Sequence, residues 1–363
     1  MDFEADVQFQ VLFAAVVLVR FFLPFWIFST PLPAIIACLV VDAVDQTVFQ
    51  AFGYDPPFYQ SYDKAMDVFY LGIAYIATLR NWVNIPAFGV SRFLFFYRQF
   101  GVVLFELTSI RAILIIFPNT FEYFFIAYEA IRSRWKTLLI SRRFWVGAAA
   151  FIWIVVKLPQ EYWIHIAQLD FTDTWTDVSW FAPLVICFGI AVIGVLWFVV
   201  RPRLAPMDHT WRFAAPQVPP DLKTAQQRAA FSAEHDRVWT GASAEKVALI
   251  GLLSIIFASI LPTVEIAPLR LLAWVGVFVV LNAMMTVRRA FHRKFIESMM
   301  TSFTLRFVAN LALLVAIEKV IYRSLPLADT VFFVLLFSVL ITAYDRCRPV
   351  YDYRRLQIQD TTP

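Results

Sequence analysis

The sequence predicts an all-α fold, a polytopic bundle of transmembrane helices, and three observations support this prediction. The 363 residues are 60% hydrophobic and 17% aromatic, and their mean hydropathy is +0.67. Only 16% of them are charged, against about 25% in ordinary soluble domains. Apolar windows of roughly 20 residues recur along the chain, and each is long enough to cross a bilayer as a helix. We therefore expect an integral, multi-pass membrane protein that is embedded in the lipid bilayer.

The apolar windows predict about eleven spans. They run from Phe9 to Phe28, Pro31 to Phe52, Tyr62 to Trp82, Phe88 to Thr108, Ile110 to Ile131, Phe144 to Ala167, Val178 to Val200, Val247 to Pro262, Leu269 to Thr286, Phe303 to Tyr322 and Thr330 to Tyr344. The fourth and fifth windows form one hairpin interrupted by polar residues, and the first window carries Arg20.

Basic residues concentrate in alternate connections. The strongest cluster is "RSRWKTLLISRR" at 132–143, and the basic stretches that begin at 201, 288 and 346 each lie an even number of predicted helices from it. Because basic loops favour the cytoplasmic side, we expect an N-out, C-in chain in the plasma (inner) membrane.

Three parts follow from the positions of the spans. Residues 1–200 form a bundle of about seven helices, and 247–363 form one of about four helices with a basic C-terminal tail. The connection 201–246 has five prolines and mixed charge, so we expect a partly disordered cytoplasmic loop.

Ionisable residues gather in predicted helices two to six. On helix two, Asp42 and Asp45 are three residues apart and share a face, and helix three begins with Asp63 and Asp67, four residues apart. We expect these four aspartates to be the ligands of a divalent cation, Mg²⁺ or Mn²⁺, if the protein uses one. The other candidates follow on helices four to six: Glu122, Glu161 and His165 as acid or base, and Arg98, Arg111, Asn119, Lys157 and Gln160 as substrate ligands.

With this orientation, most of the acids, together with Arg111 and His165, fall in the outer half of the membrane, where one polar cavity would bring them together. A charge at mid-bilayer costs about 2.5 to 3.5 kcal/mol on insertion scales, so such residues usually pair or mark a site. The alternative is that Lys64, Glu106 and Arg111 are interfacial anchors, and that Lys157 with Glu161 is a local ion pair on a helix kinked at Pro159.

The aspartate spacing resembles that of a known enzyme family. Asp42, Asp45, Asp63 and Asp67 follow D-x-x-D, an eighteen-residue step and D-x-x-x-D, which is similar to the aspartate framework of the CDP-alcohol phosphotransferases. The resemblance covers about 26 residues and implies divalent metals acting on a cytidine diphosphate donor. It departs from the family pattern where Gln46, Phe49, Gln50 and Tyr59 replace the family's Gly, Ala, Arg and later Gly. The predicted topology also turns these aspartates away from cytoplasmic nucleotides.

Three function classes remain open. The first is a proton- or cation-coupled transporter with a small-molecule or ion substrate, which the excess of acids favours. The second is a metal-dependent enzyme acting on a lipid or lipid-linked phosphate, with the four aspartates on the metal and Arg98 and Arg111 on phosphate. The third is a non-catalytic subunit or scaffold whose charges pair internally or with a partner. No nucleotide-binding Gly-rich loop, H-E-x-x-H or G-x-S-x-G motif is present, and nothing supports nucleic-acid binding.

Overall fold

The computed structural model describes residues 3–53, 59–167, 174–175, 177–195, 197–198, 201–203, 206–235, 241–260, 299–321 and 327–361. These residues form helices and connections without a β-strand. The main helices are α1 (Phe3–Phe22), α2 (Pro31–Ala51), α3 (Tyr59–Asn81), α4 (Ile85–Thr108), α5 (Ala112–Ile116), α6 (Thr120–Arg132), α7 (Arg142–Phe151), α8 (Leu158–Glu161), α10 (Phe181–Val195), α11 (Ala225–His235), α12 (Gly241–Ile260), α14 (Met299–Ile321) and α15 (Leu327–Thr361). The all-α prediction is confirmed for this part of the chain.

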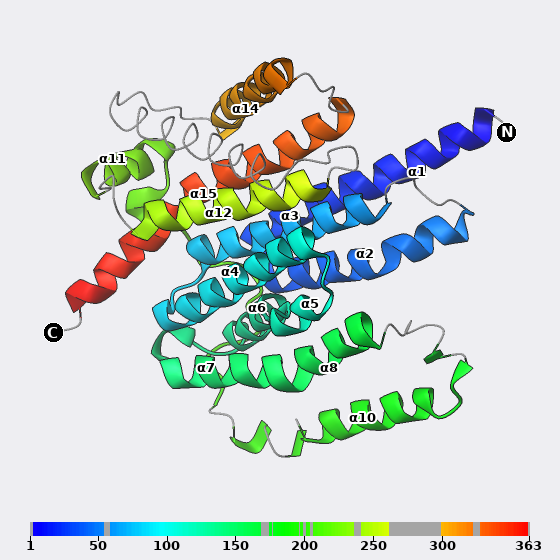
Figure 1. Cartoon of the computed structure of the whole chain (residues 1–363). Coiled ribbons are helices and arrows are strands. Elements are labelled where there is room, and N and C mark those ends of the chain that lie inside the picture. Colours follow the sequence, from blue (N-terminus) through cyan, green and yellow to red (C-terminus); the bar gives the residue numbers. More distant parts are fainter. Residues whose placement is uncertain are drawn as a thin grey trace.

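The centre of the bundle is α3, which packs against α15, α12, α4, α1 and α2 (Figure 1). Buried apolar side chains of α3, such as Phe69, Ile73 and Leu79, form the middle of the core. The packing against α15 is close at Gly72, where an added Cβ would lie 2.9 Å from Leu340 Cδ2. Helix α3 is therefore covered on several sides by other helices, which lets it carry charged residues that lipid would not tolerate.

Four helical segments are long and apolar enough to cross a membrane, among the residues that the structure describes. They are Gln8–Phe28, Pro31–Ala51, Ile85–Thr108 and Arg142–Glu161, and they agree with four of the predicted windows. The prediction of about eleven spans with an N-out, C-in arrangement is not confirmed. The window Leu269–Thr286 lies outside the described residues, and the window Ile110–Ile131 is divided into α5 and α6.

The segment from Arg142 to Ile166 alternates between α- and π-helical turns. The π-helical parts are Ile152–Lys157 and Tyr162–Ile166, on either side of the short α8. Pro159 lies in α8 and has no N–H to donate to the preceding turn. This loss favours the wider i→i+5 pairing, which the Leu158 N–H makes with Trp153 O. The kink that the sequence predicts at Pro159 thus takes the form of two π-helical turns.

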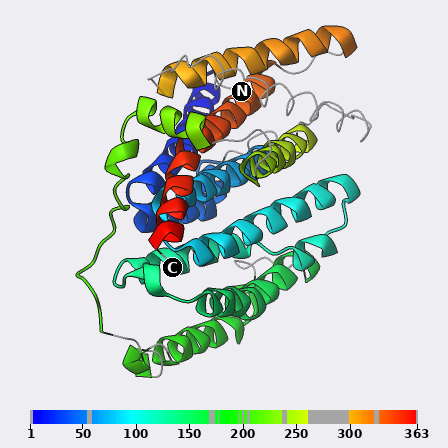
Figure 2. The same cartoon turned by 90° about the vertical axis from the view of Figure 1, so that its left-hand side faces the viewer.

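One end of the bundle is covered by residues 206–222, which we call the strap. It follows the outside of the bundle between α10 and α11 (Figure 2). The Ala215 amide donates to Ser29 O (2.7 Å), and Arg354 Nη2 donates to Gln217 O (3.1 Å). The strap therefore joins the connection between α1 and α2 to the C-terminal half of α15.

Candidate functional site

Four aspartates of α2 and α3 converge on one arginine of α1. Arg20 Nη1 contacts Asp45 Oδ2 at 2.5 Å and Asp63 Oδ1 at 2.7 Å, and Arg20 Nη2 contacts Asp67 Oδ1 at 2.8 Å and Asp42 Oδ1. We call these five residues the aspartate centre. Four carboxylates meet one guanidinium, so an excess of three negative charges remains when all are ionised.

Two members of the aspartate centre, Arg20 and Asp42, lie near the middle of the apolar segments that supply them. Arg20 is twelve residues after Gln8 and eight before Phe28, which corresponds to about 18 Å and about 12 Å along a helix. Asp42 is similarly central in Pro31–Ala51. Charges at this depth are stable only when they pair or are hydrated.

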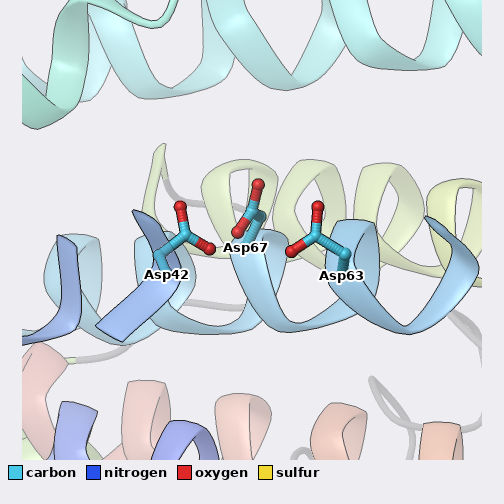
Figure 3. A group of neighbouring side chains, drawn as sticks. All are labelled: Asp42, Asp63 and Asp67. Carbon is cyan, nitrogen blue, oxygen red and sulfur yellow. The ribbon is translucent and has the colours of Figure 1, made fainter. Parts of the chain in front are cut away.

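The four aspartates differ in how far their oxygens are already used. Asp45 is 1% exposed, and its second oxygen accepts a hydrogen bond from Tyr59 Oη at 2.6 Å. Asp42, Asp63 and Asp67 are 29%, 33% and 40% exposed. Each of these three can offer one oxygen such that all three oxygens lie within 4.8 Å of one another, and their carboxylates turn towards each other (Figure 3). Of the four predicted metal ligands, these three have the geometry to share a cation.

Aromatic rings form the wall beside the Arg20 guanidinium. Its Cζ lies 5.5 Å from the centroid of the Tyr62 ring, and Tyr62 contacts Phe13, with the ring centroids 5.2 Å apart. The Tyr62 hydroxyl is buried, and none of the described residues accepts or donates a hydrogen bond to it. This wall excludes bulk water from one side of the centre and strengthens the electrostatic interactions inside it.

A second group of polar residues surrounds the break between α5 and α6. Arg98 Nη1 of α4 donates to Phe117 O (2.9 Å), a carbonyl just before Pro118. Gly101 makes this approach possible, because a Cβ at this position would collide with Phe117 Cβ. The helix interruption that the sequence predicts at Pro118 is therefore stabilised by close packing against α4 and by one partly buried guanidinium.

Residues from three helices meet at this break, and we call Arg98, Asn119, Glu122, Lys157 and Glu161 the helix-break centre. The Asn119 N–H donates to Glu161 Oε1 (3.1 Å), and Asn119 Nδ2 donates to Glu122 Oε2 (3.0 Å). Lys157 Nζ donates to Gln160 Oε1 (3.0 Å) and lies 4.2 Å from the centroid of the Tyr123 ring. Lys157 and Glu161 thus belong to a group that spans several helices, in addition to sharing one helix.

Tyr70 of α3 connects the two centres. Its hydroxyl donates to Glu122 Oε1. A small cavity is lined by Tyr70 and Arg20, with Cys38, Val41, Met66 and two residues after α1, Leu23 and Pro24. The sequence predicts one polar cavity, and the structure instead has two polar centres with Tyr70 between them.

Glu106 and Arg111 lie outside both centres. Glu106 accepts an ion pair from Lys64 at 3.1 Å, and the Lys64 side chain is 46% exposed. Arg111 is exposed at the connection between α4 and α5. His165 belongs to the second π-helical turn, and its side chain lies outside the described part of the structure. Arg98 and Arg111, the predicted phosphate ligands, are thus not brought together.

Sequence reasoning noticed Arg20 but did not assign it to the site, and it missed Tyr59 and Tyr70. An arginine in the middle of an apolar window needs a carboxylate partner in the membrane, which is the signal that identifies Arg20. The tyrosines carry no comparable signal, because Tyr is common in the apolar regions and interfaces of membrane proteins.

No protein-family model matches the chain, and neither a curated protein nor a solved structure matches it.

Proposed function

We propose that the protein is a proton- or cation-coupled transporter of the plasma membrane, with the aspartate centre as its ion-binding site. The observation that carries the proposal is the convergence of four aspartates on Arg20 near mid-span with an excess of three negative charges. An excess of charge in a partly buried site is costly, and a bound cation or proton removes it. The ion sites of secondary transporters also lie near the bilayer midplane.

Access to the centre supports this proposal over a closed structural cluster. Asp42, Asp63 and Asp67 keep 29%, 33% and 40% of their side-chain surface exposed. Arg20 itself is 4% exposed and acts as a tethered cation inside the site. An entering ion competes with Arg20 for the same carboxylates, so binding and release involve a rearrangement of α1 against α2 and α3.

The arrangement of the basic segments supports the N-out, C-in orientation. The strap, the basic cluster at 132–143 and the end of α15 share one end of the bundle: Asp208 N donates to Arg134 O (3.1 Å), and Arg354 Nη2 donates to Gln217 O (3.1 Å). Segments rich in arginine and lysine favour the cytoplasmic side. In this orientation the strapped end is cytoplasmic, and the N-terminus of α1 is outside.

A metal-dependent enzyme acting on a lipid-linked phosphate is the second candidate. It is favoured by the meeting of all four aspartates of the D-x-x-D and D-x-x-x-D motifs. Against it, Asp45 already bonds Arg20 and Tyr59 through its two oxygens, which leaves Asp42, Asp63 and Asp67 to hold a divalent cation. A scaffold function would require that the centre bind neither a proton nor a cation.

The test is ion flux in proteoliposomes that contain a pH-sensitive dye. We expect a gradient of Na⁺, K⁺, Mg²⁺, Ca²⁺ or Mn²⁺ to change the internal pH in the wild type, and Asp42→Asn and Asp67→Asn to abolish the change. Glu106→Gln is the matched control, because its carboxylate pairs with Lys64 away from the centre. No ion-driven pH change in the folded wild type would contradict the transporter. Mg²⁺- or Mn²⁺-dependent turnover of a lipid-linked phosphate would instead favour the enzyme.

A further inference from the structure

We propose that Glu122 is a second proton-binding residue of the transport path, and that Tyr70 passes protons between it and water in the small cavity that Arg20 also lines. This inference rests on the proposed function and specifies its coupling ion as the proton. It starts from a buried carboxyl group that the aspartate centre does not include.

Glu122 has hydrogen-bond partners but no ion pair among the described residues. It is 5% exposed, and it accepts hydrogen bonds from the Tyr70 hydroxyl and from Asn119 Nδ2. Neither partner carries a positive charge. A buried carboxylate without a counter-ion is unfavourable, and protonation is the simplest way to neutralise it.

The same helix provides a contrast seven residues further on. Glu129 is fully buried, and it is paired with Arg132, whose Nε lies 2.5 Å from Glu129 Oε2. Trp82 Nε1 also donates to Glu129 Oε1 (2.8 Å). Helix α6 thus carries one carboxyl group that is ion-paired in place and another, Glu122, that lacks such a partner.

The charged and titratable groups around Glu122 come from every helix packed against it. Lys157 of the first π-helical turn, Asp42 of α2 and Arg98 of α4 are the charges that act on it. Cys38 of α2 and Tyr70 of α3 are its neutral titratable neighbours. Both cations act on Glu122 electrostatically. Their hydrogen bonds go to other groups, since Lys157 donates to Gln160 and Arg98 donates to Phe117 O. This arrangement leaves the carboxyl free to gain and lose a proton.

The path from Glu122 runs through Tyr70 to the small cavity. Tyr70 lines this cavity together with Arg20, and the charges of Asp67 and Asp42 act on the Tyr70 hydroxyl. A cavity with polar groups in its wall admits water, which can bridge a gap that one hydrogen bond cannot.

The transfer balances in protons and requires no redox partner. A hydronium ion in the cavity breaks one O–H bond and gives that proton to the Tyr70 oxygen, while the Tyr70 hydroxyl proton forms the new O–H bond on Glu122 Oε1. Tyr70 is restored, the hydronium ion becomes water, and one proton has moved from the cavity to α6.

Two conservative variants test this path in the full-length protein. Tyr70→Phe removes only the hydroxyl, and Glu122→Gln keeps the shape but cannot bind a proton. We expect each to slow proton flux in the proteoliposomes by about a hundredfold, the range in which losing a proton-transfer group acts. Mn²⁺ binding at the aspartate centre, followed by electron paramagnetic resonance, should be unchanged. Tyr128→Phe is the matched control, because its buried hydroxyl bonds to Thr137 Oγ1 (2.9 Å) outside the path.

The outcomes separate this inference from the function on which it rests. Wild-type proton flux in folded Tyr70→Phe and Glu122→Gln would overturn the path through Glu122 and leave the aspartate centre as the ion site. A wild type without any proton flux would contradict the transporter itself. If a variant does not fold, infrared spectroscopy of the wild type still decides the matter. We expect a pH-dependent C=O band from a protonated carboxyl group, and we expect this band to remain in Asp42→Asn and in Asp67→Asn. Loss of the band in either variant would overturn its assignment to Glu122.

Discussion

Two networks of charged residues in the described part of the chain differ in the balance of acids and bases. In the aspartate centre, four carboxylates share one guanidinium. The other network joins α12 to α15 and α14 and contains three acids and four bases among the described residues: Glu245, Asp345 and Asp352 with Arg92, Lys246, Arg306 and Arg348. We call it the α12–α15 network.

Every carboxylate of the α12–α15 network contacts at least one cation, and Arg348 is shared by Glu245 and Asp352. Glu245 pairs with Arg348 at 2.7 Å and accepts a hydrogen bond from Tyr75 Oη at 2.5 Å. Asp345 lies 2.6 Å from both Lys246 Nζ and Arg306 Nη2. The acids of this network are thus compensated by bases of the chain itself, with one base in excess.

The difference between the networks indicates what each contributes. A compensated network holds helices in register and is expected to contribute to stability and specificity. A network with excess charge retains a demand for protons or cations that the chain does not meet. We therefore propose the aspartate centre as the functional region and expect the α12–α15 network to be structural.

The largest expected effect comes from removing the base of the aspartate centre. Arg20→Met leaves four carboxylates together without a cation, and breaking even one buried pair costs about 3 to 5 kcal/mol. We expect the variant to lose its fold near neutral pH in detergent, as followed by thermal unfolding and size-exclusion chromatography. Lowering the pH should restore stability, because protons then neutralise the carboxylates.

The matched control is Arg92→Met, because Arg92 is 44% exposed and makes one longer contact, 3.4 Å, with Glu245. Its effect should be much smaller, since a partly exposed pair is screened by solvent. An Arg20→Met protein as stable as the wild type at neutral pH would mean that the aspartates are already protonated or neutralised otherwise.

A smaller but still large effect is expected in the α12–α15 network. Glu245→Gln leaves the buried Arg348 without this carboxylate, so we expect a loss of about 3 kcal/mol in the free energy of unfolding. Cation-dependent stabilisation through the aspartate centre should persist, because separate sites contribute additively. Thermal unfolding with and without Mn²⁺ measures both. Loss of the Mn²⁺ effect in this variant would show that the two networks are coupled and would remove the distinction between them.

The smallest effect is expected at the pair outside both networks. Lys64→Met removes the contact with Glu106 (3.1 Å), and the Lys64 side chain is 46% exposed. Exposed pairs contribute about 0 to 1 kcal/mol, so unfolding and ion flux should both remain close to those of the wild type. A strong loss of flux would mean that Lys64 belongs to the aspartate centre, because Lys64 directly follows Asp63 on α3.

Part of the site could be predicted from sequence because the spacing of residues on a helix fixes their common face. Asp42 with Asp45, and Asp63 with Asp67, share faces of α2 and α3 for this reason. The break at Pro118 followed from the missing N–H. The partners of these residues could not be predicted, because Arg20 and Tyr70 reach them from helices that are distant in sequence.

The sequence by itself determined that the chain is helical and apolar, where its main apolar segments lie, and which acids share a helix face, since all three depend on local composition and periodicity. Only the tertiary structure decided which base meets the acids and that Glu122 has no ion-paired partner among the described residues. It also decided that two polar centres meet at Tyr70. These properties depend on how helices pack side by side, and the packing of distant helices is set by shape and burial that no single segment encodes.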